Sequence, residues 1–350
     1  MKTVMIDGKT VGKGYPPFVI AEAGINHNGK VETAFEMIKV AKNAGADAIK
    51  FQTFKAEELV GEPHLTYTYR SQGKEITESM LEMFKRYEFN HDEWFLIKKK
   101  CDEEGIMFLS TPQNHSDLDL LLEVGIPAIK VGSDDFTNLP LLKNYAETEL
   151  PMIVSCGMAN LAEVYQALEA IGTLDSYPTV LMLCTSEYPT PPEDVNLLKL
   201  KTLVDAFPMV TLGFSDHTRG HLASALAVAF GVSVFEKHFT LDNNLPGPDH
   251  WFSENPVGLK NWVDSIRTAF AMLGNGIVRP TEIENKMRML VRRSIAAISN
   301  IEAGDILTEK NIGLRRPGTG LPPMFLENII GLKAACKITK GTLLKMGDFR

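Results

Sequence analysis

The sequence predicts an α/β fold: a TIM (β/α)8 barrel of eight parallel strands and helices, followed by a small second domain. Three observations carry this prediction, namely the length of 350 residues, eight short apolar runs, and the amphipathic stretches between them. A TIM barrel takes about 250 residues, so one barrel and a small appendage fit this length. Eight alternations of strand-like and helix-like segments favour a parallel sheet that closes on itself.

The elements follow in order after an N-terminal hairpin, which Asp7-Gly8 between two short runs predicts. The expected strands are FVIAEAG, AIKFQT, IMFLST, AIKVGS, MIVSCG, VLMLCT, VTLGFSD and VSVFEKH. The expected helices lie at 31–44, 92–104, 115–123, 160–170, 196–206, 220–230 and 257–273. An insertion at 55–90 is aromatic and partly helical, so we expect an ordered lid or side wall of the barrel rather than a linker.

The chain divides into a barrel domain at 1–275, a charged connector at 276–291 and a module at 292–350. Within the module, IEAGDILTEKNI at 301–312 and ITKGTLLKMGDF at 338–349 share Ile, Gly, Leu and a terminal apolar residue at the same offsets. This internal repeat predicts a small pseudo-symmetric fold rich in β-structure.

Composition limits the classes of function. The formal net charge of -8 argues against a general nucleic-acid surface. The four cysteines are far apart without a CxxC pair, so neither a disulfide framework nor a structural zinc site is expected, and a reducing cytoplasm fits best. Asp7 and Gly8 interrupt the apolar start and no run reaches 18 apolar residues, so neither an export signal nor a membrane span is expected.

Polar residues gather at the ends of the expected strands, and in a barrel these ends share the rim where active sites form. His217 and His238 end the seventh and eighth strands, so their imidazoles could bind one Zn, Mn, Fe or Co ion and leave positions for water and substrate. The alternative is that one histidine caps a helix or holds a loop. His221 offers a competing helical pair with His217, but it should point away from the rim.

Lysines and hydroxyls on the same rim resemble a phosphate cradle. Lys50 and Lys130 supply positive charge, and the hydroxyl groups belong to Thr111, Ser133, Ser155 and Ser215. This set suits a small phosphorylated carboxylate, although any single hydroxyl could instead be a helix N-cap. Glu22 and the pair Asp134-Asp135 are candidates for acid/base chemistry or hydroxyl binding, with ordinary turn chemistry as the alternative.

The assembled motifs resemble the bacterial sialic acid synthase family, which includes N-acetylneuraminate, legionaminate and pseudaminate synthases. The resemblance rests on AEAGINHNG, IKFQT, STP, IKVGS, SCGM, CTSEYPTP, SDHT, EKHFT and GPDH in this order. The stretch RRSIAAISNIEAGDILTEKNIGLRRPGTG is similar to the family's C-terminal antifreeze-like domain, a SAF domain of the β-clip type.

The resemblance implies an enzyme that condenses phosphoenolpyruvate with the open-chain aldehyde of an N-acylated mannosamine-type sugar and water, giving a nonulosonic acid and phosphate. His217 and His238 would bind Mn²⁺, with Mg²⁺ or Co²⁺ also open. The implied phosphoenolpyruvate contacts are Lys50, Thr111, Lys130, Ser133, Ser155, Ser186 and Ser215. Glu22, Tyr188 and Asp249 would bind the sugar, and Asp135 would manage protons. Arg316 would reach the sugar in the partner's site of a domain-swapped homodimer.

Two positions depart from the family pattern. Asp135 stands where glutamate is usual, so Asp134 or a water relay could take its place, and Ser186 stands where asparagine is usual. The insertion and KVGSDDFTNLPLL are similar to legionaminate-type enzymes, which favours N,N'-diacetyllegionaminate synthesis over N-acetylneuraminate or pseudaminate synthesis. The same rim residues could also serve a metal-dependent aldolase or lyase, or belong to a non-catalytic carbohydrate-binding protein.

Overall fold

The computed structural model describes residues 3–62 and 64–350 and divides the chain into two compact units, 1–274 and 275–350. The predicted hairpin is present as β1 (Val4–Ile6) and β2 (Lys9–Val11), paired antiparallel. Asp7 and Gly8 both have positive φ, which a two-residue hairpin turn of type I′ requires. Met1 and Lys2, at the start of this predicted hairpin, lie outside the described residues.

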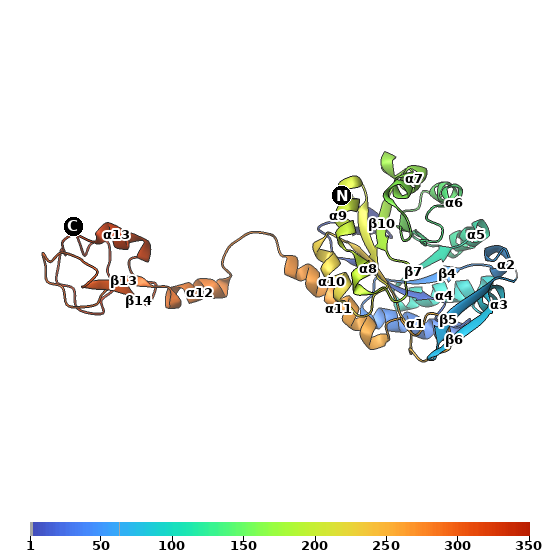
Figure 1. The fold of residues 1–350 in the computed structure, drawn as a ribbon, viewed down its shortest axis with the longest axis horizontal. Coiled ribbons are helices and arrows are strands. Elements are labelled where there is room, and N and C mark those ends of the chain that lie inside the picture. The colour runs from blue at the N-terminus through green and yellow to red at the C-terminus, as the bar shows by residue number, and fades with distance from the viewer. Residues whose placement is uncertain (1–2, 63) are drawn as a thin grey trace. The chain divides into compact units, whose positions relative to one another are not determined.

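The predicted barrel is confirmed: eight parallel strands form one sheet in the order β7-β4-β3-β12-β11-β10-β9-β8, which curls into a nearly closed barrel (Figure 1). Nearly all residues of its strands are buried, because helices cover the outside of the barrel and side chains fill the inside. The strands are β3 (Phe18–Gly24), β4 (Ala48–Thr53), β7 (Met107–Pro112), β8 (Ile129–Val131), β9 (Met152–Ser155), β10 (Thr179–Cys184), β11 (Thr211–Ser215) and β12 (Val234–His238).

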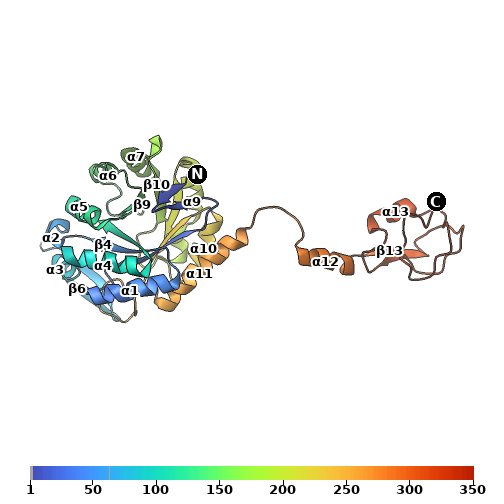
Figure 2. The same cartoon turned by 180° about the vertical axis from the view of Figure 1, so that it is seen from behind.

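Helices surround the sheet, and α1, α4 and α11 are plain on the side seen in Figure 2. The predicted helices are present as α1 (Val31–Ala44), α4 (His91–Glu104), α5 (His115–Val124), α7 (Leu161–Ile171), α9 (Leu198–Ala206), α10 (Leu222–Ala229) and α11 (Pro256–Leu273). The sequence analysis missed two helices, α6 (Leu139–Ala146) and the single turn α8 (Pro192–Val195), which are too short for a clear helical period. No helix in the described part of the chain is long and apolar enough to cross a membrane.

The described residues of the insertion after β4, which leave out Pro63, are ordered as predicted, but their centre is a β-hairpin that the sequence analysis did not identify. Strands β5 (Thr66–Ser71) and β6 (Lys74–Ser79) pair antiparallel between α2 (Ala56–Leu59) and α3 (Met80–Lys85). Both strands are mostly exposed and polar, so they lack the apolar alternation that marks a half-buried strand. Beneath the hairpin, Ile25, Phe54, Met83 and Tyr87 form a small separate core.

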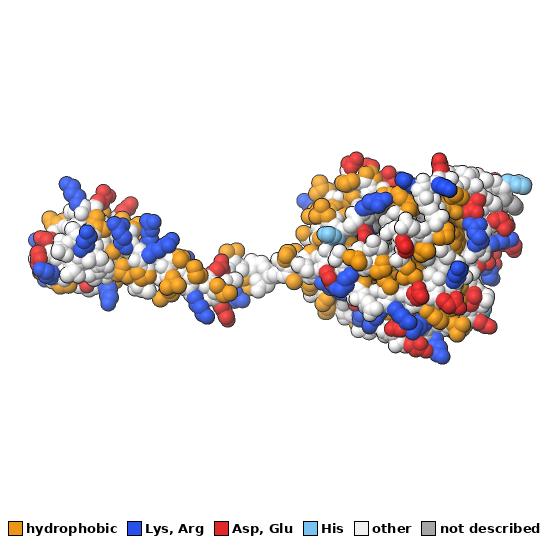
Figure 3. All heavy atoms as spheres, turned by 90° about the horizontal axis from the view of Figure 1, so that it is seen from below, with side chains coloured by type: hydrophobic (Ala, Val, Ile, Leu, Met, Phe, Trp, Pro, Cys, Tyr) orange, Lys and Arg blue, Asp and Glu red, His pale blue; other side chains and the backbone are white. Residues whose placement is uncertain are grey.

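The C-terminal unit has its own apolar core, and the internal repeat is visible in its pairing. Ile301 and Ile338, the first residues of the two repeats, exchange both backbone hydrogen bonds, at 2.9 and 2.8 Å. The regular elements are β13 (Ser294–Ala297), β14 (Ile312–Arg315), α13 (Leu326–Ile329) and α12 (Glu282–Val291). Helix α12 lies inside the segment predicted as a connector. Basic side chains are spread over the face of this unit seen in Figure 3.

Candidate active site

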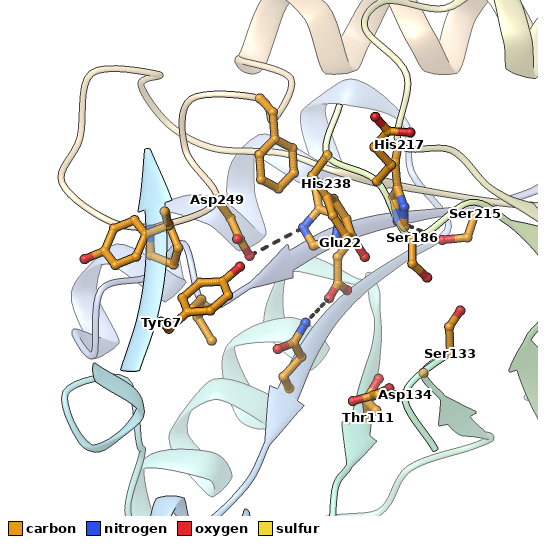
Figure 4. A pocket seen from close by; sticks show the side chains of 18 of the residues that line it. Glu22, Tyr67, Thr111, Ser133, Asp134, Ser186, Ser215, His217, His238 and Asp249 are labelled. Atoms are coloured by element: carbon orange, nitrogen blue, oxygen red, sulfur yellow. Dashed lines mark hydrogen bonds and ion pairs between the residues drawn. The ribbon is translucent and has the colours of Figure 1, made fainter. Parts of the chain in front are cut away.

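A cavity of 1170 Å³ lies at the carboxyl ends of the barrel strands, where TIM barrels place their active sites. Residues from all eight barrel strands or from the loops that follow them line it, and Figure 4 shows several of their side chains converging. The β5–β6 hairpin and the loop after β12 extend its wall outward. The floor and this outer wall differ in chemistry.

The floor contains two lysines and two carboxylates, all buried. Lys50 Nζ lies 2.7 Å from Glu22 Oε2 and 3.7 Å from Glu236 Oε2. Lys130 Nζ lies 3.8 Å from Glu236 Oε1. Buried charges are tolerated in a protein when they are paired in this way, and here the pairs face an open cavity rather than a closed core.

Electrostatics separate the two carboxylates of the floor. Burial raises the pKa of Glu22 above its ordinary value, and the pull of Lys50 only partly offsets this rise. Burial also disfavours the charge on Glu236, but Lys130 and Lys50 together lower its pKa. Glu236 is therefore the fixed negative charge between the lysines, and Glu22 is the group that can take up a proton near neutral pH.

Hydroxyl groups converge beside the lysines. Thr111 Oγ1 lies 3.1 Å from Lys50 Nζ, and Ser155 Oγ lies 2.8 Å from Lys130 Nζ. A β-carbon at Gly157 would come within 2.6 Å of Ser133 Oγ and 2.5 Å of Ser186 Oγ, so only glycine lets these hydroxyls approach the backbone. The backbone N–H of Gly157 donates to Ser133 Oγ at 3.0 Å. Ammonium, hydroxyl and backbone N–H donors around one cavity suit an anion with several oxygens.

The two rim histidines lie next to each other, with ring centroids 5.5 Å apart. His217 Nδ1 is 2.8 Å from the Thr185 carbonyl oxygen. The other ring nitrogen of His217, Nε2, lies 3.3 Å from Ser215 Oγ on the cavity side. Burial, followed by the charge of His217, lowers the pKa of His238 well below its ordinary value, so the neutral form is favoured. Its buried Nδ1 has no hydrogen-bond partner among the described residues and lies 3.9 Å from Asp249 Oδ2.

The neutral form of His238 fits a metal ligand, because neutral histidine is the form that binds metals. Burial opposes the charge on His217, but Cys184 and the Thr185 carbonyl raise its pKa, so His217 would release a proton on binding a divalent cation. Within residues 3–62 and 64–350, no third His, Cys, Asp or Glu groups with the pair closely enough to complete a three-residue metal site.

The outer wall of the cavity contains more aromatic side chains than the floor. The Tyr188 ring lies 4.1 Å from the His217 ring and 5.1 Å from the Phe252 ring, measured between centroids. Asp249 and Tyr67 point toward each other across the opening (Figure 4), and burial raises the pKa of the Asp249 carboxyl to about 6. Aromatic faces with a few polar groups between them are typical of sites that bind sugars and acyl groups.

The structure brings together most of the predicted residues of the barrel unit around the cavity, but Asp135 and His221 do not line it. Asp135 does not line it, since its Oδ1 accepts a hydrogen bond from Asn138 Nδ2 at 3.0 Å, and Asp134 lines the cavity instead. The role of Asp135 in managing protons stays a prediction, and of the two neighbours it is the alternative, Asp134, that lines the cavity. His221 is exposed at the start of α10, as expected. Arg316 is exposed in the C-terminal unit, and its predicted contact with a partner stays a prediction.

Sequence reasoning missed Glu236, and it gave no role to Gln52 at the rim or to the individual residues of the expected side wall. Gln52 Nε2 donates to Glu22 Oε1 at 3.2 Å, and Ser215 Oγ donates to Glu236 Oε1 at 2.9 Å. Glu236 lies two residues before His238, and Gln52 two residues after Lys50. The alternation of side chains along a strand was therefore a signal for both, because residues two apart face the same side.

Comparisons with known proteins agree with this geometry. The NeuB family matches residues 37–278, and the SAF domain matches residues 292–350. N,N'-diacetyllegionaminic acid synthase of Legionella pneumophila is 40% identical over 96% of this chain and 95% of its own. Pseudaminic acid synthase of Campylobacter jejuni is 34% identical over 95% of this chain and 96% of its own.

A solved structure supports the same assignment. The N-acetylneuraminic acid synthetase of Leptospira borgpetersenii superposes with a TM-score of 0.73 at 32% identity, covering 82% of this chain and 95% of its own. Family, sequence relatives and structure therefore agree over nearly the whole chain. The protein belongs to the NeuB family and is an enzyme of the sialic acid synthase type, built from a TIM barrel and a C-terminal SAF domain.

Proposed function

We propose that this enzyme condenses phosphoenolpyruvate with 2,4-diacetamido-2,4,6-trideoxymannose and water to form N,N'-diacetyllegionaminate and phosphate. The observation that carries the proposal is the buried floor: Lys50 and Lys130 beside four hydroxyls, next to a histidine pair at the barrel rim. A pyruvate-type lyase would not need the donors that suit a phosphate. The choice of sugar is supported by the legionaminic relative, which is 40% identical, against 34% for the pseudaminic relative.

The floor residues would bind and orient phosphoenolpyruvate. Lys50 and Lys130 suit its carboxylate and phosphate, while Thr111, Ser133, Ser155, Ser186 and Ser215 supply hydrogen bonds that fix its direction. Its C3 then forms a bond with the aldehyde carbon of the acceptor, and the aldehyde oxygen takes up a proton. Water adds to C2 with loss of a proton, and the bond from C2 to the phosphate oxygen breaks.

The remaining groups would position the acceptor and move protons. His217 and His238 would hold the divalent cation, which we propose is Mn²⁺ and which would supply a Lewis acid for the aldehyde oxygen. Glu22 is suited to bind an acceptor hydroxyl, since Gln52 and Lys50 hold its carboxyl in place. Glu22 is also the carboxyl at the cavity whose raised pKa suits it to exchange a proton. Asp134 lines the cavity as a further polar group, and Tyr188 and Asp249 would contact the sugar.

We also propose a homodimer in which the C-terminal unit of one chain completes the site of the other through Arg316. Helix α12 supports this because it buries no residue: Ile283 is 74% exposed and Leu290 is 64% exposed. An amphipathic helix with an open apolar face is typical of an interface.

The test is phosphate release from phosphoenolpyruvate with Mn²⁺, with 2,4-diacetamido-2,4,6-trideoxymannose and N-acetylmannosamine compared as acceptors, and with a chelator as control. We expect release with the diacetamido sugar, a lower rate with N-acetylmannosamine, and none after chelation. A higher rate with N-acetylmannosamine would overturn the choice of sugar. Absence of release with both, from folded protein that binds Mn²⁺, would overturn the synthase reaction for these acceptors.

A further inference from the structure

The outer wall of the cavity is built from two segments that are far apart in the sequence. Ser71 Oγ, on the β5–β6 hairpin, accepts a hydrogen bond from the backbone N–H of Gly247 at 3.1 Å. Gln72 Nε2, in the turn of the hairpin, donates to the Asn244 carbonyl at 2.9 Å. Both partners lie in the loop after β12 that also carries Asp249 and Trp251. These bonds hold the hairpin against the loop and so fix the shape of the wall.

Trp251 strengthens the same junction. The guanidinium of Arg70, from the hairpin, lies 5.4 Å from the centre of the Trp251 ring, and that of Arg219 lies 5.6 Å from it. Cation–π contacts of this length are favourable and occupy the ring face. Side chains carried by such a junction are preorganised, because the backbone beneath them is held at both ends.

Tyr67 stands on this wall with its polar end free. It is on β5, lines the cavity and is 40% exposed, and Figure 4 shows it directed with Asp249 into the opening. Its neighbour Tyr69 has its hydroxyl engaged, since that group donates to Glu78 at 2.6 Å. The Tyr67 hydroxyl has no hydrogen-bond partner in the described part of the chain. A tyrosine in a ligand cavity with an open hydroxyl offers an aromatic face and one polar contact.

The direction of the reaction determines what reaches Tyr67. The new bond joins C3 of phosphoenolpyruvate to the aldehyde carbon, so the aldehyde end of the acceptor must lie at the floor, beside Lys50 and the histidine pair. The opposite end of the sugar chain would then reach the outer part of the same cavity, which Asp249 and residues of the β5–β6 hairpin line. This part of the acceptor carries the groups by which candidate sugars differ, namely a hydroxyl or an acetamido group at C4 and a hydroxymethyl or a methyl group at C6.

We propose that Tyr67 is a specificity-determining residue that contacts the C4 to C6 end of the acceptor. Its hydroxyl donates a hydrogen bond to the carbonyl oxygen of a 4-acetamido group, and its ring covers the adjacent methyl groups. This inference rests on the proposed function and adds the residue that selects a diacylated 6-deoxy sugar over a sugar with hydroxyls at both positions. Tyr67 is partly exposed, so water can replace the missing partner, and a hydrogen bond that only one acceptor makes gives discrimination of about the net value of one hydrogen bond.

The experiment compares kcat/KM for the two acceptors in wild-type protein and in three variants. Tyr67→Phe removes only the hydroxyl, and Tyr67→Ala removes the ring as well. Tyr165→Phe is the matched control, since this tyrosine lies on the barrel surface in α7 with its hydroxyl 3.3 Å from Glu169. Phosphate release is followed at saturating phosphoenolpyruvate, the KM for phosphoenolpyruvate is measured separately, and thermal unfolding checks that each variant is folded.

We expect Tyr67→Phe to lose about 5- to 10-fold in kcat/KM for 2,4-diacetamido-2,4,6-trideoxymannose, the size of one hydrogen bond. Tyr67→Ala should lose about 30-fold or more, mainly through the KM for this sugar, because apolar contact is lost as well. Both variants should change N-acetylmannosamine turnover and the KM for phosphoenolpyruvate by less than about 3-fold, which is below the loss of one hydrogen bond.

The outcomes separate the inference from the function on which it rests. An active wild-type enzyme whose preference between the two sugars is the same in both Tyr67 variants would overturn the role of Tyr67 alone. Equal losses for both sugars would do so too, because they indicate a general binding or structural contribution. A wild-type protein that turns over neither sugar would overturn the proposed function, and the inference would fall with it.

Discussion

The barrel unit at 1–274 carries 23 Lys and Arg against 37 Asp and Glu, whereas the C-terminal unit at 275–350 carries 13 against 7. The net charges of -14 and +6 account for the total of -8, so the chain joins an acidic body to a basic module. All eight histidines lie in the barrel. The catalytic chemistry is thus concentrated in one unit, and the other can contribute positive charge to it only by binding. The opposite charges of the two units make electrostatic association between them testable.

The largest effect should come from the barrel's histidine pair. Replacing His238 with alanine removes one of two proposed metal ligands, and we expect activity to fall by about 10³-fold or more, since a Lewis acid contributes several kcal/mol to such reactions. Phosphate release with Mn²⁺ measures the loss, and circular dichroism checks the barrel. His221→Ala is the matched control, because this imidazole is exposed at the start of α10 and should be dispensable. Full activity in His238→Ala would contradict the metal site.

The next effect tests whether the basic module reaches a catalytic site. Arg316→Ala should lower kcat/KM for the acceptor by about 10- to 100-fold, the size of a charge-assisted hydrogen bond, and leave the KM for phosphoenolpyruvate unchanged. Arg315→Ala is the control, because this neighbouring exposed arginine donates to the Leu314 carbonyl within its own unit. Equal effects of the two substitutions would indicate a general charge contribution instead of a specific contact.

Acid should destabilise the barrel selectively. Burial lowers the pKa of His27 to about 3 and that of His250 to about 4, against an ordinary value of 6.5. The unfolded chain therefore binds more protons below pH 6.5, so stability is complete above that pH and is lost as pH falls toward 4. Each histidine contributes up to about 1.4 kcal/mol per pH unit in this window. The C-terminal unit has no histidine and should lack this dependence.

Thermal or urea unfolding at several pH values checks the acid effect, with His27→Asn expected to reduce the slope. His91→Asn is the comparison variant, because Glu123 and Asp92 raise the pKa of this exposed histidine, which gives the opposite sign. Buried Asp117, whose pKa burial raises to about 6, opposes the histidines over part of the range, so the slopes of variants are compared rather than absolute values. An unchanged slope in His27→Asn would contradict the assignment.

The smallest effect concerns association between the oppositely charged units. If a basic module binds an acidic barrel in a dimer, its dissociation constant should rise a few-fold between about 0.05 and 0.5 M salt, because exposed charges are screened over shorter distances. Sedimentation velocity at several protein concentrations measures this shift. If the dissociation constant does not change with salt, the interface must be formed mainly by apolar surfaces such as α12. If the protein is a monomer at every concentration, dimerisation is contradicted.

Much of the fold could be predicted because its signals are local. The run FVIAEAG coincides with β3 and AIKFQT with β4, since both are short, mostly apolar runs that end in small or polar residues. The β5–β6 hairpin was harder to predict, because most residues of Thr66–Ser71 and Lys74–Ser79 are exposed and only a few, such as Tyr69, pack against apolar side chains. Only their contacts with a loop about 170 residues away give them a role.

The sequence alone determined which residues reach the barrel rim, because the end of a strand and the alternation of side chains between its two faces are local properties. Lys50, Lys130, His217 and His238 were identified on this basis. Only the tertiary structure decided how they pair: that Glu236 lies between the lysines, and that Asp134 rather than Asp135 faces the cavity. The physical reason is that the direction of a side chain in a loop, and the charge that surrounds a buried group, depend on neighbours brought together by closure of the barrel.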